Sequence, residues 1–220
     1  MSLYTTSDLS SYGHQEFQLQ YTNALRPDVE IIADIIRTTV STGGSLKPGD
    51  TIQIGCSLCR VIDRGEHLGL EEPSFQSDPI QWVDSVDSTA RHLRLQMAAA
   101  ESCNLGGDLN FPSITNTAFV CSSIDQTEGI FMDRVRPLSN QDSGWFVACS
   151  DQNHDHDSNE NLKQESLYAL TLRKPAVIPF LGFPIGTTAM IHRDQKPQVL
   201  LHGSMLRPEE NSYLDRPLEN

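Results

Sequence analysis

The apolar residues of this 220-residue chain change their spacing about halfway along. In the first half, two long segments repeat apolar residues at every third or fourth position, which is the period of an amphipathic helix. In the second half, short apolar runs are separated by turn residues, which is typical of strands. We therefore predict an α+β protein, in which a smaller α/β N-terminal domain with two helices precedes a C-terminal domain with a mostly antiparallel sheet and one main helix.

Two segments of the first half are predicted to be helices. Residues 26–44 carry an apolar stripe, with Pro27 near the start and two glycines at the end. Residues 87–105 repeat apolar residues at the same spacing, with Asp87 as the expected N-cap. Between the two helices, residues 51–55 alternate like a strand, whereas residues 65–79 are expected to form a loop.

The second half is predicted to contain short strands and one helix near 162–172. The expected strands are Ala118–Cys121, Ile130–Val135, Trp145–Ala148, Thr187–His192 and Val199–His202. Glycine, asparagine and proline are concentrated near residue 108, which marks the expected domain boundary. We therefore expect a flexible arm at 1–16, an N-terminal domain at 17–108 and a C-terminal domain at 109–220.

The formal net charge of −13 constrains the partners of the chain. A protein this acidic repels nucleic acid and anionic membranes, and its natural macromolecular partner has a basic surface. No apolar run approaches the roughly 20 residues of a membrane helix, and the polar start of the chain lacks the features of a signal peptide. We therefore expect a cytoplasmic protein.

Two stretches, 65–90 and 137–162, contain acidic residues but neither lysine nor arginine. Acidic loops help to keep a protein soluble, but two separate stretches favour an electrostatic docking face. A tryptophan among the carboxylates either anchors an interface or holds its loop to the neighbouring helix. The candidate partner-binding residues are Asp151, Asp155, Asp157, Glu160, Glu66, Glu71, Glu72, Asp78 and Trp82.

The segment CSDQNHDHDSNE at 149–160 contains residue types that bind metals, but its spacing fits no metal motif. Counted as a calcium loop from Asp151, it has His156 where glycine is needed and Leu162 where a bidentate glutamate is needed. His154 and His156 have the spacing to bind a transition metal from a strand, but the loop is too polar to be predicted as a strand.

The five cysteines are odd in number and scattered, which fits reduced thiols better than a disulfide framework. Cys56 and Cys59 form a single CxxC pair, whereas structural zinc requires a second pair. We interpret them as two small buried residues on or beside a strand. The chain has no motif of a hydrolase, a metalloprotease or a nucleotide-binding enzyme. We therefore predict no catalytic residue, no metal ion and no cofactor, and a binding protein instead of an enzyme.

Three segments of the second half match motifs of a known bacterial domain, and they occur in the same order. They are DSGW at Asp142–Trp145, a helix start with Tyr168 and Leu170, and the run KPAVIPFLGFPIG at 174–186. Over residues 116–194, the chain resembles the thirty-third family of immunity proteins from bacterial polymorphic toxin systems. The acidic stretch of that family is shorter and richer in glutamate, so the histidines of NHDHD depart from its pattern.

The resemblance implies that the chain binds a specific toxin and protects the producing cell and its kin. It brings no catalytic residues, and the matching glycines and prolines are expected to be structural. The first hundred residues resemble a domain fused in front of this one near type VI secretion toxins. Toxins that cut nucleic acid need basic clefts, so a nuclease is the preferred toxin class. Two alternatives stay open, namely a metal-dependent hydrolase that uses the histidine–aspartate loop, and a scaffold or chaperone for toxin loading.

Overall fold

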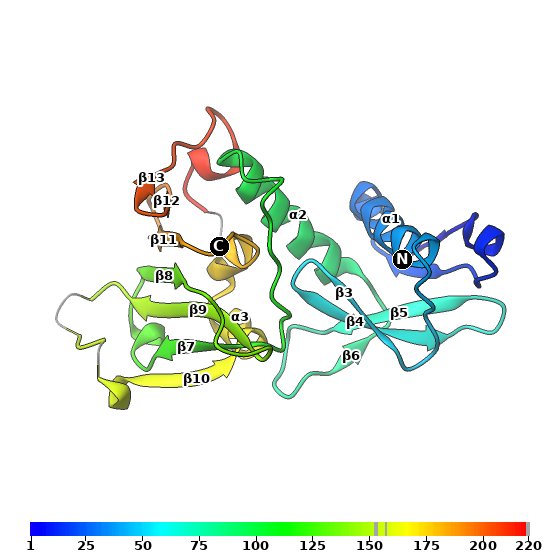
Figure 1. The fold of residues 1–220 in the computed structure, drawn as a ribbon, viewed down its shortest axis with the longest axis horizontal. Helices are drawn as coiled ribbons and strands as arrows, with labels where there is room; N and C mark the ends of the chain where they lie inside the picture. Colours follow the sequence, from blue (N-terminus) through cyan, green and yellow to red (C-terminus); the bar gives the residue numbers. More distant parts are fainter. Residues whose placement is uncertain (152–153, 157, 219–220) are drawn as a thin grey trace. The chain divides into compact units, whose positions relative to one another are not determined.

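The computed structural model describes residues 1–151, 154–156 and 158–218, and the chain forms two compact units, 1–94 and 95–220 (Figure 1). The division between the units falls within helix α2 (Asp87–Ser102), and the domain boundary near residue 108 stays a prediction from the sequence. Within the described ranges, no helix has the length and apolar composition needed to cross a membrane. The α+β fold predicted from the sequence is confirmed, because a large, mostly antiparallel sheet occurs with few helices.

Unit 1 combines a two-stranded hairpin, helix α1 and a four-stranded antiparallel sheet in the order β3-β4-β5-β6. Before the sheet lie β1 (Ser2–Thr5), η1 (Leu9–Tyr12), β2 (Gln18–Tyr21), η2 (Asn23–Leu25) and α1 (Arg26–Ser41). The sheet strands are β3 (Thr51–Ile54), β4 (Ser57–Asp63), β5 (Leu68–Pro73) and β6 (Trp82–Val83). The flexible arm expected at 1–16 is instead ordered, since β1 pairs with β2 along its whole length.

The apolar stripe of α1 faces the core of unit 1, as its spacing predicts. Val29, Ile32 and Ile36 are fully buried, and the helix ends just before the glycine pair. The loop expected at 65–79 is wrong for its central part, because β5 forms there. That strand escapes the sequence pattern because both of its faces are buried, which removes the alternation of apolar and polar residues.

Unit 2 is built on a seven-stranded sheet in the order β10-β7-β9-β8-β11-β12-β13. All neighbouring strands are antiparallel except β7 and β9, which run parallel. The strands are β7 (Thr117–Cys121), β8 (Ile130–Arg134), β9 (Asp142–Cys149), β10 (Leu162–Ser166), β11 (Thr187–Ile191), β12 (Gln198–Leu201) and β13 (Ser204–Met205). The helical segments are η3 (Ile124–Gln126), η4 (Asn159–Asn161), α3 (Leu167–Arg173), η5 (Pro175–Phe180) and η6 (Tyr213–Asp215).

The helix expected near 162–172 is wrong in its first half, which forms edge strand β10. Gln164 and Glu165 pair across to β7, and their polar side chains suit a strand at the edge of a sheet. Helix α3 begins only afterwards, where the hydroxyl of Ser166 accepts a hydrogen bond from the backbone N–H of Ala169. The five strands predicted for this half all form, with small differences at their ends.

Two turns of unit 2 depend on glycines with left-handed backbone conformations. Gly144 has a φ of +77°, and a side chain there would meet the carbonyl oxygen of Val135 at 2.2 Å. Gly186 has a φ of +90°, and a side chain there would meet the ring of His202. Both positions therefore require glycine for structural reasons, as the sequence resemblance implies.

Candidate functional site

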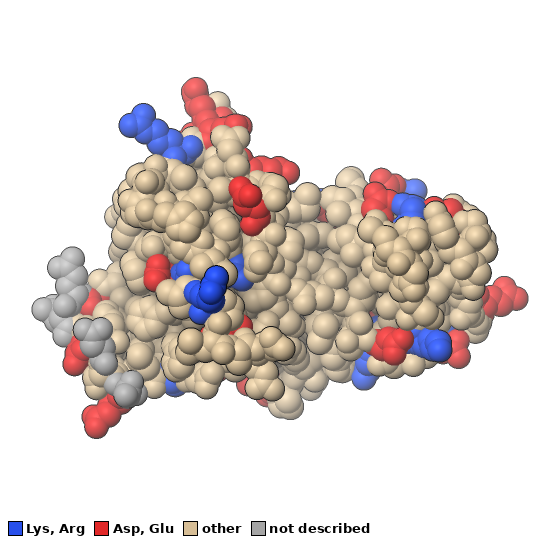
Figure 2. Space-filling view, in the orientation of Figure 1, with Lys and Arg blue, Asp and Glu red and all other residues tan. Residues whose placement is uncertain are grey.

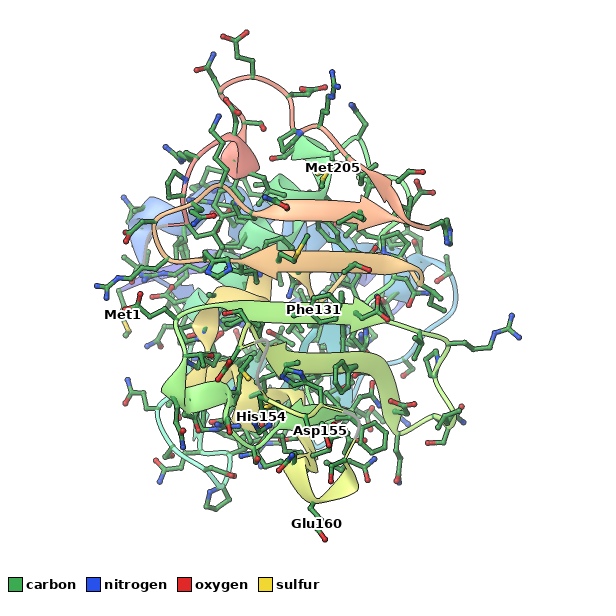
Figure 3. All side chains as sticks on the ribbon, turned by 90° about the vertical axis from the view of Figure 1, so that its left-hand side faces the viewer. Met1, Phe131, His154, Asp155, Glu160 and Met205 are labelled. Carbon is green, nitrogen blue, oxygen red and sulfur yellow. The ribbon has the colours of Figure 1, made fainter. Side chains whose placement is uncertain are left out.

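One face of the seven-stranded sheet carries apolar side chains that remain accessible to solvent. Along β8 and β11, every second residue is buried and packs toward the core. The residues between them point to the opposite face, on which Figure 3 labels Phe131. We call this surface the open face, and it comprises Phe119, Phe131, Asp133, Phe146, Thr188, Met190, Leu200 and Met205.

Cross-strand pairing places the open-face residues next to one another. Phe119 pairs with Phe146, and Phe131 pairs with Met190. Phe119 at one end is 41% exposed and Met205 at the other is 54% exposed. The face runs across six of the seven strands, and the apolar residues between these two ends are half-buried, so it is a candidate protein-binding surface. Sequence reasoning missed it, although apolar residues on both faces of β8 were a signal that could have revealed it.

A polar pair lies among the apolar side chains of the open face. The hydroxyl of Thr188 donates a hydrogen bond of 2.8 Å to the carboxylate of Asp133 on the neighbouring strand. The carboxylate retains acceptor capacity for a donor from a partner protein. An apolar surface with a few placed polar groups is the arrangement that gives a protein interface both affinity and orientation.

The segment after β9 places part of the predicted acidic loop beside the open face. In Figure 3, His154 and Asp155 lie in front of the strands, and Glu160 points away from the sheet. Asp151, Asp155 and Glu160 are exposed, and Figure 2 shows a few acidic side chains at this edge and others scattered over the visible face. Asp157 lies outside the described residues. The structure therefore leaves three of the four predicted carboxylates of this loop accessible.

The same loop brings its two histidines to two cysteines that are far apart in the sequence. Cys121 ends β7 and Cys149 ends β9, and both side chains are buried. The side chains of His154 and His156 lie beside that of Cys121, and His156 also contacts Cys149. All five cysteines of the chain are free thiols, and burial raises the pKa of the Cys149 thiol. The chain thus contains a cluster with metal-binding residue types, which the sequence pattern did not predict.

The acidic residues predicted in unit 1 differ in their accessibility. Glu66 and Asp78 are exposed in loops. The carboxylate of Glu71 forms an ion pair with Arg60, and the guanidinium of Arg60 lies 5.0 Å from the centre of the Trp82 ring. Trp82 and Glu71 therefore both contact the side chain of Arg60. These contacts stabilise the sheet, and they also occupy two of the residues that were predicted to bind a partner.

Glu72 differs from the other acidic candidates because it is only 1% exposed. Its two carboxylate oxygens accept hydrogen bonds from the backbone N–H groups of Ser88 and Thr89, at 2.9 and 2.6 Å. These N–H groups belong to the first turn of α2, where they have no partner within the helix. Glu72 is therefore a helix cap from a neighbouring strand, and its burial removes it from the candidate docking residues.

We expect replacement of Glu72 by alanine to lower the free energy of unfolding by about 1–3 kcal/mol, because two buried N–H groups would lose their acceptor. Urea unfolding followed by circular dichroism measures the change. Replacement of the exposed Glu66 by alanine is the control and should stay within about 0.5 kcal/mol of the parent. Equal effects at the two positions would contradict the capping role.

The titration of Glu72 reports the burial of its carboxyl group. Burial raises its pKa above the ordinary 4.5, although the N–H groups of Ser88 and Thr89 act in the opposite direction. A raised pKa means that its contribution to stability is fully present below pH 4.5 and is lost as the pH rises through the folded-state pKa. The stability of the parent relative to Glu72→Gln should therefore rise as the pH is lowered from neutral toward 4.5.

Unit 2 also contains a hollow of about 380 Å³ beside the start of η5. Its charged groups already have partners. Arg173 forms ion pairs with Asp125 and Glu165, and the ammonium group of Lys174 donates to the carbonyl of Thr127 at 3.0 Å. Such paired groups stabilise the walls of the hollow and provide little for the chemistry of an enzyme.

Comparison with known families identifies the part of the chain that carries the open face. Residues 96–202 match the family model described as the Imm33-like domain. These residues lie within unit 2 and run from α2 through β12, so the match includes most of the open face and the acidic loop. This part of the chain is similar to the Imm33-like domain, which supports the resemblance predicted over 116–194. No curated protein and no solved structure shows significant similarity to the chain.

The Imm33-like domain suggests that the protein is an immunity protein. An immunity-protein family implies a partner that is a toxin.

Proposed function

We propose that this chain is a cytoplasmic immunity protein that binds a cognate secreted toxin through the open face and thereby protects the producing cell and its kin. The observation that carries the proposal is the accessible apolar sheet face within the part of the chain that is similar to the Imm33-like domain. Burial of Phe119, Phe131 and Met190 against a partner would supply roughly 25 cal/mol for each Å² of apolar surface removed from water.

The acidic loop beside the open face supports a basic partner. The net charge of −13 attracts a positively charged protein over a distance, and the exposed carboxylates of Asp151, Asp155 and Glu160 concentrate that charge. Enzymes that cleave nucleic acid have basic clefts because their substrate is a polyanion. We therefore propose a nuclease as the toxin, delivered by a type VI secretion system.

Co-expression with the toxin encoded by the neighbouring gene tests this function. We expect the two proteins to co-purify and the growth of the toxin-expressing cell to be restored. If the proteins bind but growth is not restored, the chain is a scaffold or chaperone for toxin loading. If the pair neither co-purifies nor restores growth, the proposed function is wrong.

Charge reversal in the acidic loop is expected to slow association with the toxin. The double variant Asp155→Lys and Glu160→Lys should lower the association rate constant by roughly tenfold at low salt, because electrostatic steering weakens. The dependence of that rate constant on salt should also become weaker. Stopped-flow or surface-plasmon-resonance measurements at several ionic strengths report both effects.

A matched control separates local charge from net charge. The double variant Glu209→Lys and Glu210→Lys changes the net charge equally at two exposed positions outside the loop. We expect its association rate constant to stay closer to that of the parent. Equal slowing by both double variants would show that the loop has no special part in the encounter.

A further inference from the structure

The two cysteines of unit 2 meet because β7 and β9 are parallel neighbours. The carboxyl ends of parallel strands lie at the same edge of a sheet, and Cys121 and Cys149 are the last residues of these two strands. Their Sγ atoms are 3.7 Å apart, so both sulfurs face one point at the end of the sheet. The β7–β9 pairing therefore unites two residues that no short sequence motif connects.

The loop after β9 adds two imidazole rings to the same point. The Nε2 atom of His156 lies 3.2 Å from the Sγ atom of Cys149. One ligand atom each from Cys121, His154 and His156 fall within 4.8 Å of one another. The Nε2 atom of His154 is buried and, among the described residues, has no hydrogen-bond partner. Binding of a metal ion by this nitrogen would explain why it is buried without a hydrogen-bond partner.

The distance between the two sulfurs is that of a tetrahedral zinc site, and the distance from Cys149 to His156 is slightly shorter. Cys149 adjoins the group formed by Cys121, His154 and His156, so it completes a site of four ligands by a small movement of the loop. Zinc bound at about 2.3 Å by sulfur and about 2.0 Å by nitrogen holds two sulfurs roughly 3.8 Å apart, and a sulfur and a nitrogen roughly 3.6 Å apart. We propose that Cys121, Cys149, His154 and His156 bind a zinc ion. Thiolate and imidazole ligands in this combination favour zinc over calcium or magnesium, which take oxygen ligands.

The surroundings of the cluster suit a bound cation. The backbone N–H of Ser123, two residues after Cys121, donates to the Sγ atom of Cys121 at 3.4 Å. Donors to sulfur stabilise the thiolate form that binds metal. The side-chain amide of Asn161 donates to the carbonyl of Asp155 at 2.9 Å and so fixes the loop between the two histidines.

The zinc ion would be structural, because four protein ligands leave no position for a water molecule or a substrate. Its effect would be to fasten the acidic loop to the end of the sheet, next to the open face. The loop would then present its carboxylates in one arrangement and lose less conformational entropy when a partner binds. The inference concerns the chain alone, so it is tested without the toxin.

Metal analysis of the untagged full chain, purified under reducing conditions without chelators, tests the site. We expect one equivalent of zinc in the parent. We also expect Co²⁺ added to the metal-free protein to give visible d–d bands and a thiolate-to-cobalt charge-transfer band. The variants Cys149→Ser and His156→Asn should each lower zinc affinity by at least about 10- to 100-fold, since loss of a ligand exceeds the effect of an outer-shell change.

Two controls keep the inference falsifiable. Cys103→Ser alters a buried cysteine outside the cluster, and His202→Asn alters an exposed histidine outside it, so both should retain zinc. His154→Asn and His156→Asn change loop residues, so they test the site even if the cysteine variants unfold. Zinc retained by both histidine variants would overturn the assignment. It would equally be overturned by a reduced parent that binds neither Zn²⁺ nor Co²⁺ in a single equivalent, or that binds Co²⁺ without a thiolate band.

Discussion

Replacement of Phe131 by aspartate is expected to weaken toxin binding by about 100-fold or more. Phe131 lies on a central strand of the open face, between the pairs that it forms with Ala148 and Met190. Aromatic residues at the centre of an interface contribute about 2 kcal/mol or more, and a buried unpaired carboxylate adds a further cost. Isothermal titration or surface plasmon resonance with purified toxin measures the dissociation constant.

The same substitution should leave the fold intact, because the Phe131 side chain points away from the buried residues of β8. Leu138→Asp is the matched control, since Leu138 is 86% exposed in the turn after β8 and lies outside the open face. We expect Leu138→Asp to bind toxin within a few-fold of the parent, and both variants to unfold near the parent temperature. If Phe131→Asp binds as tightly as Leu138→Asp, the open face is not the contact surface.

The parts of the fold that the sequence predicted are those whose patterns are local. Helix α1 has a clear apolar stripe with a proline at its start, and five strands of unit 2 are short apolar runs between turn residues. Strands β5 and β10 were missed for opposite reasons. One is buried on both faces, and the other is a polar edge strand whose residues also suit a helix.

The candidate sites were harder to predict because they depend on strand order. The open face is formed by residues from six strands, and only cross-strand register shows that Phe119 and Phe146 are neighbours. The cysteine–histidine cluster depends on β7 and β9 being adjacent, although β8 lies between them in the sequence. The sequence does identify the histidine loop as unusual. It does not show that Cys121 and Cys149 lie beside that loop, because their proximity depends on the pairing of β7 with β9.

Glu72 is the reverse case, a residue that the sequence suggested as part of a site and that the structure shows to be buried. Its position among acidic residues suggested a docking surface, whereas its side chain serves the first turn of α2. Charge along a sequence therefore predicts the net electrostatic field of the protein well, and the accessibility of any one carboxylate poorly.

Arg134 links segments of unit 2 that are distant in the sequence. It is 2% exposed at the end of β8, and its guanidinium donates to the backbone carbonyls of Asn110, Leu181 and Phe183. It also lies 5.5 Å from the centre of the Trp145 ring. The indole N–H of Trp145 donates to the carbonyl of Leu181 at 3.1 Å. The DSGW strand and the PFLGFP segment are therefore held together by hydrogen bonds to main-chain carbonyls.

We expect Arg134→Leu to lower the free energy of unfolding by about 1–3 kcal/mol, because the buried carbonyl of Phe183 would lose this donor, whereas the Leu181 carbonyl keeps the indole N–H of Trp145 and Asn110 is exposed to water. Arg134→Lys should recover only part of this loss, since a single ammonium group cannot reproduce the geometry of the guanidinium. Arg136→Leu, at an exposed position two residues later, should change the stability by less than about 0.5 kcal/mol. Chemical unfolding of the three variants, followed by Trp fluorescence, distinguishes these outcomes. If Arg134→Leu were as stable as Arg136→Leu, these hydrogen bonds would not be what holds the two segments together.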